Sequence, residues 1–330
     1  MRIRALVAGL VAIAMLLLSA CSGAGAGSAG PDGRREVTIS VVSAFDRDDP
    51  LMEGFWLFEK NLKESAPWVK LDYRGAGEVM ASAQLGEGVS TGGIDMAATA
   101  AVFHSQNVPM TRAMALSPLS PAEEREKGAH KLYEDAHAKA GIHYLGRMAD
   151  EVPYKLYFKD QVNPLDLKGK SIRTSPVYVG LLEALGAGPV AMPPGEVFGA
   201  MERGVVAGYG WPALGVVKNG WVDVTGYETS AEFYTMDTVV IMSDLKWQSL
   251  DEDTQKAISD AMIKTENEVG PMYADLVEKE TKERADGGVK VIEMNEADTK
   301  KFVDTAYEAG WKQVLSRTPE AQEMRTIYGN

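Results

Sequence analysis

The hydrophobic positions of the chain follow two periods from Val37 onward. Short apolar runs suit buried strands, and the longer segments between them have the i, i+3, i+4 spacing of amphipathic helices. The strand-like runs are 37–42, 69–75, 93–101 and 141–148, and the helix-like segments are 51–65 and 121–140. Strands that alternate with helices in this way predict an α/β fold built in layers.

The pattern changes near Asp150, where VPYKLYFKD at 152–160 alternates apolar and polar residues before a turn. We interpret this change as the start of a second domain. A compact βαβαβ unit follows, with strands at 171–174, 189–192 and 205–210 and helices at 176–185 and 195–203. The strands of such a unit are parallel, so their carboxyl ends share one edge, and ligands bind in the crevice beside that edge.

Arg173 stands at this edge, just before a helix for which Ser175 is the predicted N-cap, Pro176 the first residue and Gly186 the stop. A guanidinium beside free helix amides suits a carboxylate, sulfonate or phosphate. A solvated surface arginine is the alternative. The carboxyl ends also hold Thr174, Pro193, Pro194, Tyr209 and Trp211. An arginine and two aromatic residues at one crevice favour a ligand-binding role for Arg173 over a solvated one.

A very long helix is predicted after the strand at 239–243. The sequence Ser249-Leu250-Asp251-Glu252 has the form of a capping box, and Asp286-Gly287-Gly288 ends the helical pattern. The helix either spans both domains and braces them or lies at the periphery with a kink at Gly270-Pro271. A last helix is predicted over 296–316.

The N-terminal segment has the pattern of an export signal. Arg2 and Arg4 precede an apolar run that is too short for a membrane span and ends in Leu18-Ser19-Ala20-Cys21. This ending looks like a bacterial lipobox, which predicts a lipoprotein signal peptide over 1–20 and lipidation of Cys21. The alternative is an export signal with a chance cysteine. The Gly, Ala and Ser-rich residues 21–35 are expected to form a flexible tether.

Composition narrows the possible chemistry. With 34 Lys and Arg against 47 Asp and Glu, the formal net charge is −13, which disfavours nucleic acid as a partner. Cys21 is the only cysteine, so no intrachain disulfide forms. The four histidines, at 104, 130, 137 and 143, show no metal-ligand spacing.

No catalytic constellation is visible. Gly88-Val89-Ser90-Thr91-Gly92 matches the GxSxG pattern but lacks the strand-turn-helix context of a nucleophile elbow. Neither GxGxxG nor GxxxxGK[ST] occurs where a cofactor or phosphate would need it. We therefore expect no enzyme, no metal and no cofactor, although a hydrolase that uses Ser90 is kept as an alternative to be tested.

Residues 164–212 resemble the DctP-type solute-binding proteins of TRAP transporters, the tripartite ATP-independent periplasmic systems. The matching motifs are LDLKGKSIR, ALGAGPVAM, the helix start PPGEVF and GVVAGYGWP. Weaker similarity extends over most of the chain and includes Gly-Ile-Asp-Met at 93–96.

The resemblance implies a two-lobed periplasmic binding protein fold, with a β-sheet flanked by helices in each lobe and the long helix bracing both. Lobe I would comprise 36–149 with a return segment at about 239–280, and lobe II 150–238 with about 281–330. Such a receptor closes over a small organic acid and delivers it to a small and a large membrane subunit. In the family, the arginine matching Arg173 pairs with the ligand carboxylate, and some members place a second arginine near Arg147.

Departures from the family pattern concern the ligand. Trp211 and Ala100 replace an asparagine and an acidic residue of sugar-acid-binding members, and Pro194 replaces a bulky residue. We therefore expect an aromatic or apolar monocarboxylate, such as an indole-type 2-oxo acid or amino acid, between walls formed by Trp211, Tyr209, Phe103 and Met80. The alternatives are a sugar acid or dicarboxylate, or a sensory or adhesive lipoprotein of the same fold. The expected location is extracytoplasmic, with lipidated Cys21 in a bacterial membrane.

Overall fold

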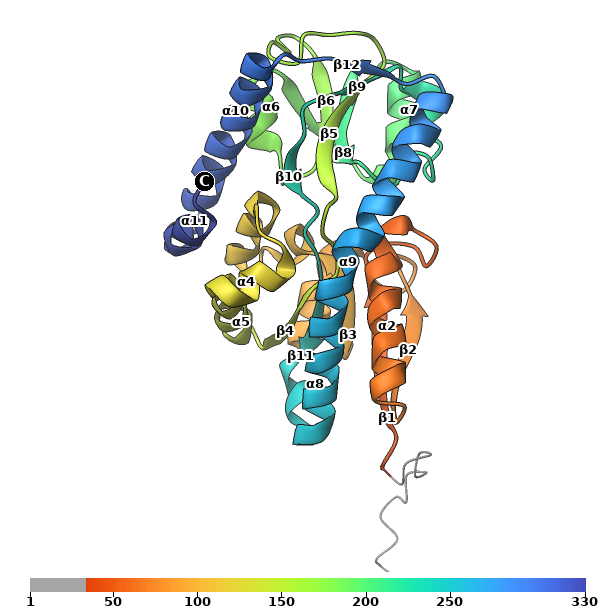
Figure 1. Cartoon of the computed structure of the whole chain (residues 1–330), viewed down its shortest axis with the longest axis vertical. Coiled ribbons are helices and arrows are strands. Elements are labelled where there is room, and N and C mark those ends of the chain that lie inside the picture. Colours follow the sequence, from red (N-terminus) through yellow and green to blue (C-terminus); the bar gives the residue numbers. More distant parts are fainter. Residues whose placement is uncertain (1–33) are drawn as a thin grey trace, which may run out of the picture.

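The computed structural model describes residues 34–330, so the predicted signal peptide, Cys21 and nearly all of the tether lie outside the described residues. Residues 34–330 form two β-sheets, each flanked by helices, and one long helix runs beside both (Figure 1). No helix in this part of the chain combines the length and the apolar character that a membrane crossing needs. The two-lobed α/β fold expected from the sequence is confirmed.

The first lobe is built on a five-stranded mixed sheet in the order β2-β1-β3-β11-β4. Its strands are β1 (Val37–Ser43), β2 (Val69–Gly75), β3 (Met96–Ala100), β4 (Ile142–Arg147) and β11 (Thr238–Ser243). Its helices are α2 (Glu53–Ser65), α3 (Leu85–Ser90), α4 (Pro121–Lys127), α5 (Ala129–Ala138) and α8 (Asp244–Gln248), with short 3-10 turns η1 (Pro50–Met52), η2 (Ser82–Gln84), η3 (Ala101–His104) and η4 (Pro109–Leu116). β11 returns from the second lobe and pairs antiparallel with β3 and β4.

The second lobe is built on a seven-stranded sheet in the order β12-β9-β5-β8-β6-β7, with β10 paired to β5. Its strands are β5 (Pro153–Phe158), β6 (Ser171–Thr174), β7 (Gly188–Ala191), β8 (Gly208–Pro212), β9 (Tyr227–Thr229), β10 (Phe233–Thr235) and β12 (Lys290–Ile292). Its helices are α6 (Val179–Ala184) and α7 (Val197–Glu202), with 3-10 turns η5 (Pro194–Glu196) and η6 (Trp221–Val224). β6 pairs parallel with β7 and β8, which confirms the βαβαβ unit and its shared carboxyl edge.

The start of α6 differs from the prediction. The helix begins at Val179 behind Tyr178, and Ser175 does not cap it. Residues 175–178 form a turn whose last residue, Tyr178, is fully buried against β8. Burial of this large aromatic ring outweighs the local capping preference of Ser175.

The long helix α9 (Glu252–Asp286) runs through Pro271 without interruption. Its N-cap is Asp251, whose carboxylate accepts a hydrogen bond from the Thr254 amide at 2.7 Å. The capping box predicted at Ser249 is therefore wrong: the Ser249 hydroxyl donates to the Lys246 carbonyl at the end of α8. The first half of α9 packs on α2, and Arg284 near its end pairs with Glu228 of β9 at 2.7 Å, so the bracing helix is confirmed.

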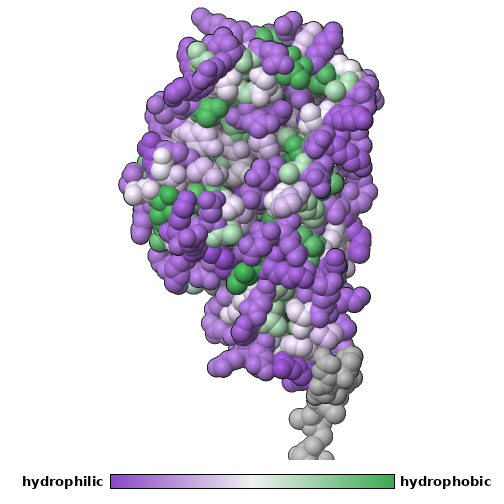
Figure 2. Space-filling model, viewed as in Figure 1, coloured by the Kyte–Doolittle hydropathy of each residue, from purple (hydrophilic) through white to green (hydrophobic). Residues whose placement is uncertain are grey.

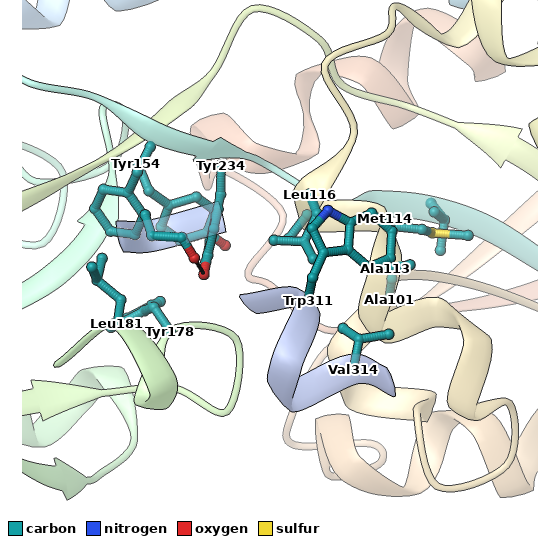
Figure 3. Close-up of a cluster of buried hydrophobic side chains, with 14 of the residues drawn as sticks. Ala101, Ala113, Met114, Leu116, Tyr154, Tyr178, Leu181, Tyr234, Trp311 and Val314 are labelled. Carbon is teal, nitrogen blue, oxygen red and sulfur yellow. Dashed lines mark hydrogen bonds between the residues drawn. The ribbon is translucent and has the colours of Figure 1, made fainter. Parts of the chain in front are cut away.

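The C-terminal segment touches both lobes. α10 (Glu296–Leu315) packs on α6 and on η4, where Figure 3 shows Trp311 lying beside Leu116 and Met114. The turn η7 (Pro319–Ala321) leads to α11 (Gln322–Tyr328), which packs on α5. Tyr328 hydrogen-bonds Tyr133 at 2.7 Å. The expected assignment of residues 281–330 to lobe II therefore does not describe α11, which lies on lobe I.

The outer surface is mainly polar. The face seen in Figure 2 is hydrophilic with small, scattered hydrophobic areas. The large hydrophobic side chains that are exposed within residues 34–330 are far apart in the chain: Val79, Val205, Leu245, Ile263 and Val291. Such single exposures are ordinary, so this surface gives no sign of a large apolar docking face.

Candidate functional site

A cavity of about 500 Å³ is lined by residues of both lobes and of the segments that connect them. Lobe I contributes Ala100 at the end of β3 and Phe103 in η3, and lobe II contributes Arg173 of β6 and Trp211 of β8. Most of the lining is apolar, and its further apolar residues include Phe45, Leu51, Val102, Met192, Pro194 and Met236. The size and lining suit a small organic molecule.

Arg173 is buried in this lining, with only 3% of its surface exposed. Its Nε and Nη2 both donate to the Met192 carbonyl at 3.2 Å. Its Nη1 donates to the Tyr178 hydroxyl at 2.8 Å and to the Gly210 carbonyl at 3.2 Å. These bonds hold the guanidinium in place and leave one Nη2 N–H for another partner.

The charge of Arg173 is not balanced by the protein itself. Within residues 34–330, no carboxylate lies within 4.0 Å of its guanidinium, whereas Arg125, Arg147 and Arg284 each pair with a glutamate. Carbonyl and hydroxyl partners satisfy hydrogen bonds but do not neutralise a cation. Because a buried charge without a counter-charge is expensive, the position favours an anion supplied from the cavity.

Aromatic rings border the same space. The Arg173 guanidinium lies 5.1 Å from the centre of the Trp211 ring, and the Trp211 indole N–H donates to the Leu214 carbonyl at 3.1 Å. Across the cavity, the rings of Phe45 and Phe103 lie 6.2 Å apart. These contacts hold the rings in place as apolar walls of the cavity.

Seven of the residues that the sequence places at the site line the cavity: Arg173, Trp211, Thr174, Phe103, Pro193, Pro194 and Ala100. Thr174 turns its hydroxyl to the Ser175 carbonyl at 2.8 Å. The βαβαβ edge therefore brings its predicted residues together except Tyr209, as parallel pairing requires.

Three predicted residues do not line the cavity. Arg147 is buried in lobe I, where its Nη1 lies 3.0 Å from Glu124 and also donates to the Leu119 carbonyl. The resemblance therefore suggested a ligand contact at a position that instead carries an internal ion pair. Tyr209 shares a face of β8 with Trp211, but it lies two residues further from the edge and stacks on Tyr157 at 5.0 Å. Met80 packs against the backbone of α3 at Gly88.

The sequence analysis missed Asp237 and the tyrosines at 154 and 178, all of which line the cavity. Asp237 occupies the connection between β10 and β11 and is 2% exposed. Burial raises the pKa of its carboxyl to about 6, although nearby backbone amides lower it. The only sequence signal was an acidic residue two positions before the buried strand at 239–243.

Catalytic and metal chemistry find no support in the described part of the chain. Ser90 is the last residue of α3, and its hydroxyl donates to the Ala140 carbonyl at 2.6 Å. Across residues 34–330, no group of three or more His, Cys, Asp or Glu side chains is placed to hold a metal ion. The GxSxG pattern is thus part of a helix end.

A cavity between two sheet-based lobes, with a held but unpaired cation in its wall, defines a receptor that encloses a small solute. The chain belongs to the bacterial extracellular solute-binding protein family 7, DctP, whose model matches residues 41–317. The family consists of solute-binding proteins, so the chain is a receptor and not an enzyme.

Individual relatives are distant. The ectoine-binding periplasmic protein TeaA of Halomonas elongata is 22% identical over 205 residues, which cover 61% of this chain and 60% of that protein. The C4-dicarboxylate-binding periplasmic protein DctP of Rhodobacter capsulatus is 29% identical over 160 residues, 48% of this chain and 44% of that protein. These alignments span about half the length of the curated relatives.

The solved structures agree on the fold over nearly their whole length. A TRAP periplasmic solute-binding protein from Desulfovibrio salexigens with bound orotic acid has a TM-score of 0.76 at 22% sequence identity. The alignment covers 88% of this chain and 97% of that one. At this identity the likeness establishes the two-lobed fold alone.

Proposed function

We propose that the protein is the extracytoplasmic solute receptor of a TRAP transporter and binds a small organic acid that has a single carboxylate on an aromatic or apolar body. The observation that carries this proposal is Arg173, a buried cation in the cavity wall without a counter-charge among residues 34–330. A ligand carboxylate would neutralise it and accept its free N–H.

The rest of the lining supports an apolar body for the ligand. Trp211 and the pair of Phe45 and Phe103 offer ring faces rather than hydrogen bonds. Burying a sugar hydroxyl without a partner costs about 1 to 3 kcal/mol, so a polyhydroxylated sugar acid is disfavoured at these walls. A dicarboxylate is disfavoured too, because the described lining holds one cation and its other charged residue is Asp237.

Membership in the family and the relatives named above support delivery of the solute to small and large TRAP membrane subunits. We further propose that the receptor is held at a bacterial membrane through lipidated Cys21, on the basis of the Leu-Ser-Ala-Cys pattern. A sensory or adhesive lipoprotein on this fold would bind the solute without such delivery. Neighbouring genes for two membrane subunits would favour transport over that alternative.

A thermal-shift and calorimetry screen of the wild-type protein tests the ligand class. The probes are indole-3-pyruvate, L-tryptophan, 3-phenylpropanoate, succinate and D-glucuronate. We expect stabilisation by at least one of the three monocarboxylates with an aromatic body, since only a ligand that binds the folded state raises its melting temperature. Stabilisation by succinate or glucuronate alone would contradict the proposed class.

The Arg173→Gln variant tests the anion site. Removing the buried cation should weaken the binding of any carboxylate found in the screen by about 2 kcal/mol or more, roughly 30-fold in Kd. Arg203→Gln is the matched control, because Arg203 is exposed and lies outside the cavity lining. Equal affinities for wild type and Arg173→Gln would move the anion site elsewhere.

A further inference from the structure

The cavity contains a second buried charge that the proposed carboxylate contact does not use. Asp237 lies in the connection directly before β11, and its Oδ1 is buried without a hydrogen-bond partner in the described part of the chain. The neighbouring Thr238 hydroxyl, which also lines the cavity, lacks a partner as well. Buried polar atoms are nearly always hydrogen-bonded, so an unsatisfied pair in a cavity wall points to a missing donor.

Asp237 does not serve as the counter-ion of another residue. Its carboxylate lies beyond 4.0 Å from every basic group of residues 34–330, including Arg173. The positive charge of Arg147 in lobe I lowers the pKa of Asp237, but the ion-pair partners of Arg147 are Glu124 at 3.0 Å and Asp150 at 3.7 Å. The carboxylate therefore has no ion-pair partner within 4.0 Å, although backbone amides and the more distant charge of Arg147 lower its pKa.

Arg173 and Asp237 both affect the pKa of Tyr154, another residue of the cavity lining. Tyr154 is buried, and burial raises the pKa of its phenol; Asp237 raises that pKa further, while Arg173 lowers it. The Tyr154 ring lies 5.7 Å from the ring of Tyr178, whose hydroxyl holds Arg173. Arg173 and Asp237 line the same cavity, and no other charged side chain belongs to its described lining.

We propose that Asp237 binds a hydrogen-bond donor of the ligand, so that the solute is a compact molecule with a carboxylate for Arg173, an amine or ring N–H for Asp237 and an apolar body between the aromatic walls. This inference rests on the proposed function and narrows it. An amino acid then pairs with both buried charges, and a cyclic N–H acid pairs with Arg173 and hydrogen-bonds Asp237, whereas a 2-oxo acid without an N–H group leaves Asp237 without a donor.

Matched pairs of probes test the donor requirement in the wild-type protein. The pairs are L-phenylalanine and 3-phenylpropanoate, and L-proline and cyclopentanecarboxylate. Each pair keeps the carboxylate and the body and removes only the N–H donor. In the pair that binds most tightly, calorimetry at pH 7.5 should give at least tenfold tighter binding of the member with the donor.

The Asp237→Asn variant assigns that preference to a residue. It should weaken binding of the donor probe at least tenfold while the affinity for its donor-free partner stays within about threefold or improves. Asp275→Asn, an exposed position on α9, is the matched control. A circular dichroism melt of each variant establishes that it is folded. The comparison of the probe pairs uses only the wild-type protein, so it does not depend on the folding of a variant.

The outcomes separate this inference from the proposed function. Equal affinity within every pair, or an unchanged preference in Asp237→Asn, overturns the role of Asp237 and leaves the Arg173 site standing. No binding of any probe by the folded wild-type protein, or equal affinity of wild type and Arg173→Gln for a carboxylate that does bind, overturns the proposed function and this inference with it.

Discussion

At the scale of single residues, burial explains the four histidines better than metal binding. His104 and His137 approach with their Nε2 atoms 2.9 Å apart, and the His143 ring stacks on Trp247 with the ring centres 3.8 Å apart. Burial lowers the pKa of His130 to about 3 and the pKa of His137 and of His143 to about 4. All three are therefore neutral in the folded protein near pH 7.

The His143→Gln variant tests this burial. Below pH 6.5 the unfolded chain protonates His143, while the folded protein does so only near pH 4, so the side chain costs stability as the pH falls through that window. Relative to the variant, wild type should lose up to about 1.4 kcal/mol of unfolding free energy per pH unit between pH 6 and 5. Urea unfolding followed by circular dichroism at pH 7, 6 and 5 measures the difference.

Taking the difference between the two proteins cancels the opposing effect of Glu266 and Asp237, whose pKa values are raised by burial to about 7 and about 6. A raised carboxyl pKa makes the folded state bind more protons and so favours it at low pH. Parallel pH profiles for wild type and His143→Gln would contradict a buried, neutral His143.

At the scale of elements, the contact between strand β8 and the turn before α6 holds the anion site. Gly210 accepts hydrogen bonds at its carbonyl from both Arg173 and Tyr178. A Cβ at this glycine would lie 2.4 Å from Cε2 of the Tyr178 ring. Because Gly210 has no side chain, the Tyr178 ring can pack against β8 and its hydroxyl can accept the hydrogen bond from Arg173.

The Gly210→Ala variant should displace Tyr178. Overpacking at such a contact costs about 1 to 3 kcal/mol of stability, and the loss of the Tyr178 hydroxyl should also weaken carboxylate binding. Thermal melts and calorimetry with the tightest carboxylate probe measure the two effects. Gly77→Ala is the control, because a Cβ there meets no heavy atom within 4 Å. An Arg173 site independent of Tyr178 would leave the affinity of Gly210→Ala unchanged.

At the scale of the whole molecule, three segments of the chain connect the two lobes. The chain passes between them at residues 148–152, at 236–237 and along α9. Asp237 lies in one of these connections and Arg173 lies in lobe II. A ligand that contacts both residues therefore links an interlobe connection to lobe II. Differential contacts of this kind are what allow a solute to favour the closed state.

Attachment to the membrane is also a property of the whole molecule. If Cys21 is lipidated, the full-length protein expressed in a bacterium should enter the detergent phase on Triton X-114 partition, because acyl chains add about 0.8 kcal/mol of membrane affinity per buried methylene. Cys21→Ser should move it to the aqueous phase. An aqueous wild-type protein would contradict the anchor, whereas Ser19→Thr, inside the same motif, serves as the control that retains the cysteine.

Much of the architecture could be predicted because it follows from local rules. The period of apolar residues separates strands from helices, a βαβαβ unit has one handedness, and Arg173 and Trp211 therefore had to reach one sheet edge. Element ends were less predictable, as Ser175 and Ser249 illustrate, since a buried ring or a competing cap moved each helix start.

The identity of the second charge in the cavity could not come from the chain alone. Arg147 and Asp237 are both charged residues next to apolar strands, yet one pairs with Glu124 inside lobe I and the other belongs to the cavity lining without an ion-pair partner. Nothing local distinguishes them, because each outcome depends on a neighbour that is distant in sequence and on how the lobes pack. Pairing across such distances is settled by the burial of whole surfaces, so the folded molecule was needed to reveal which charges are left for a ligand.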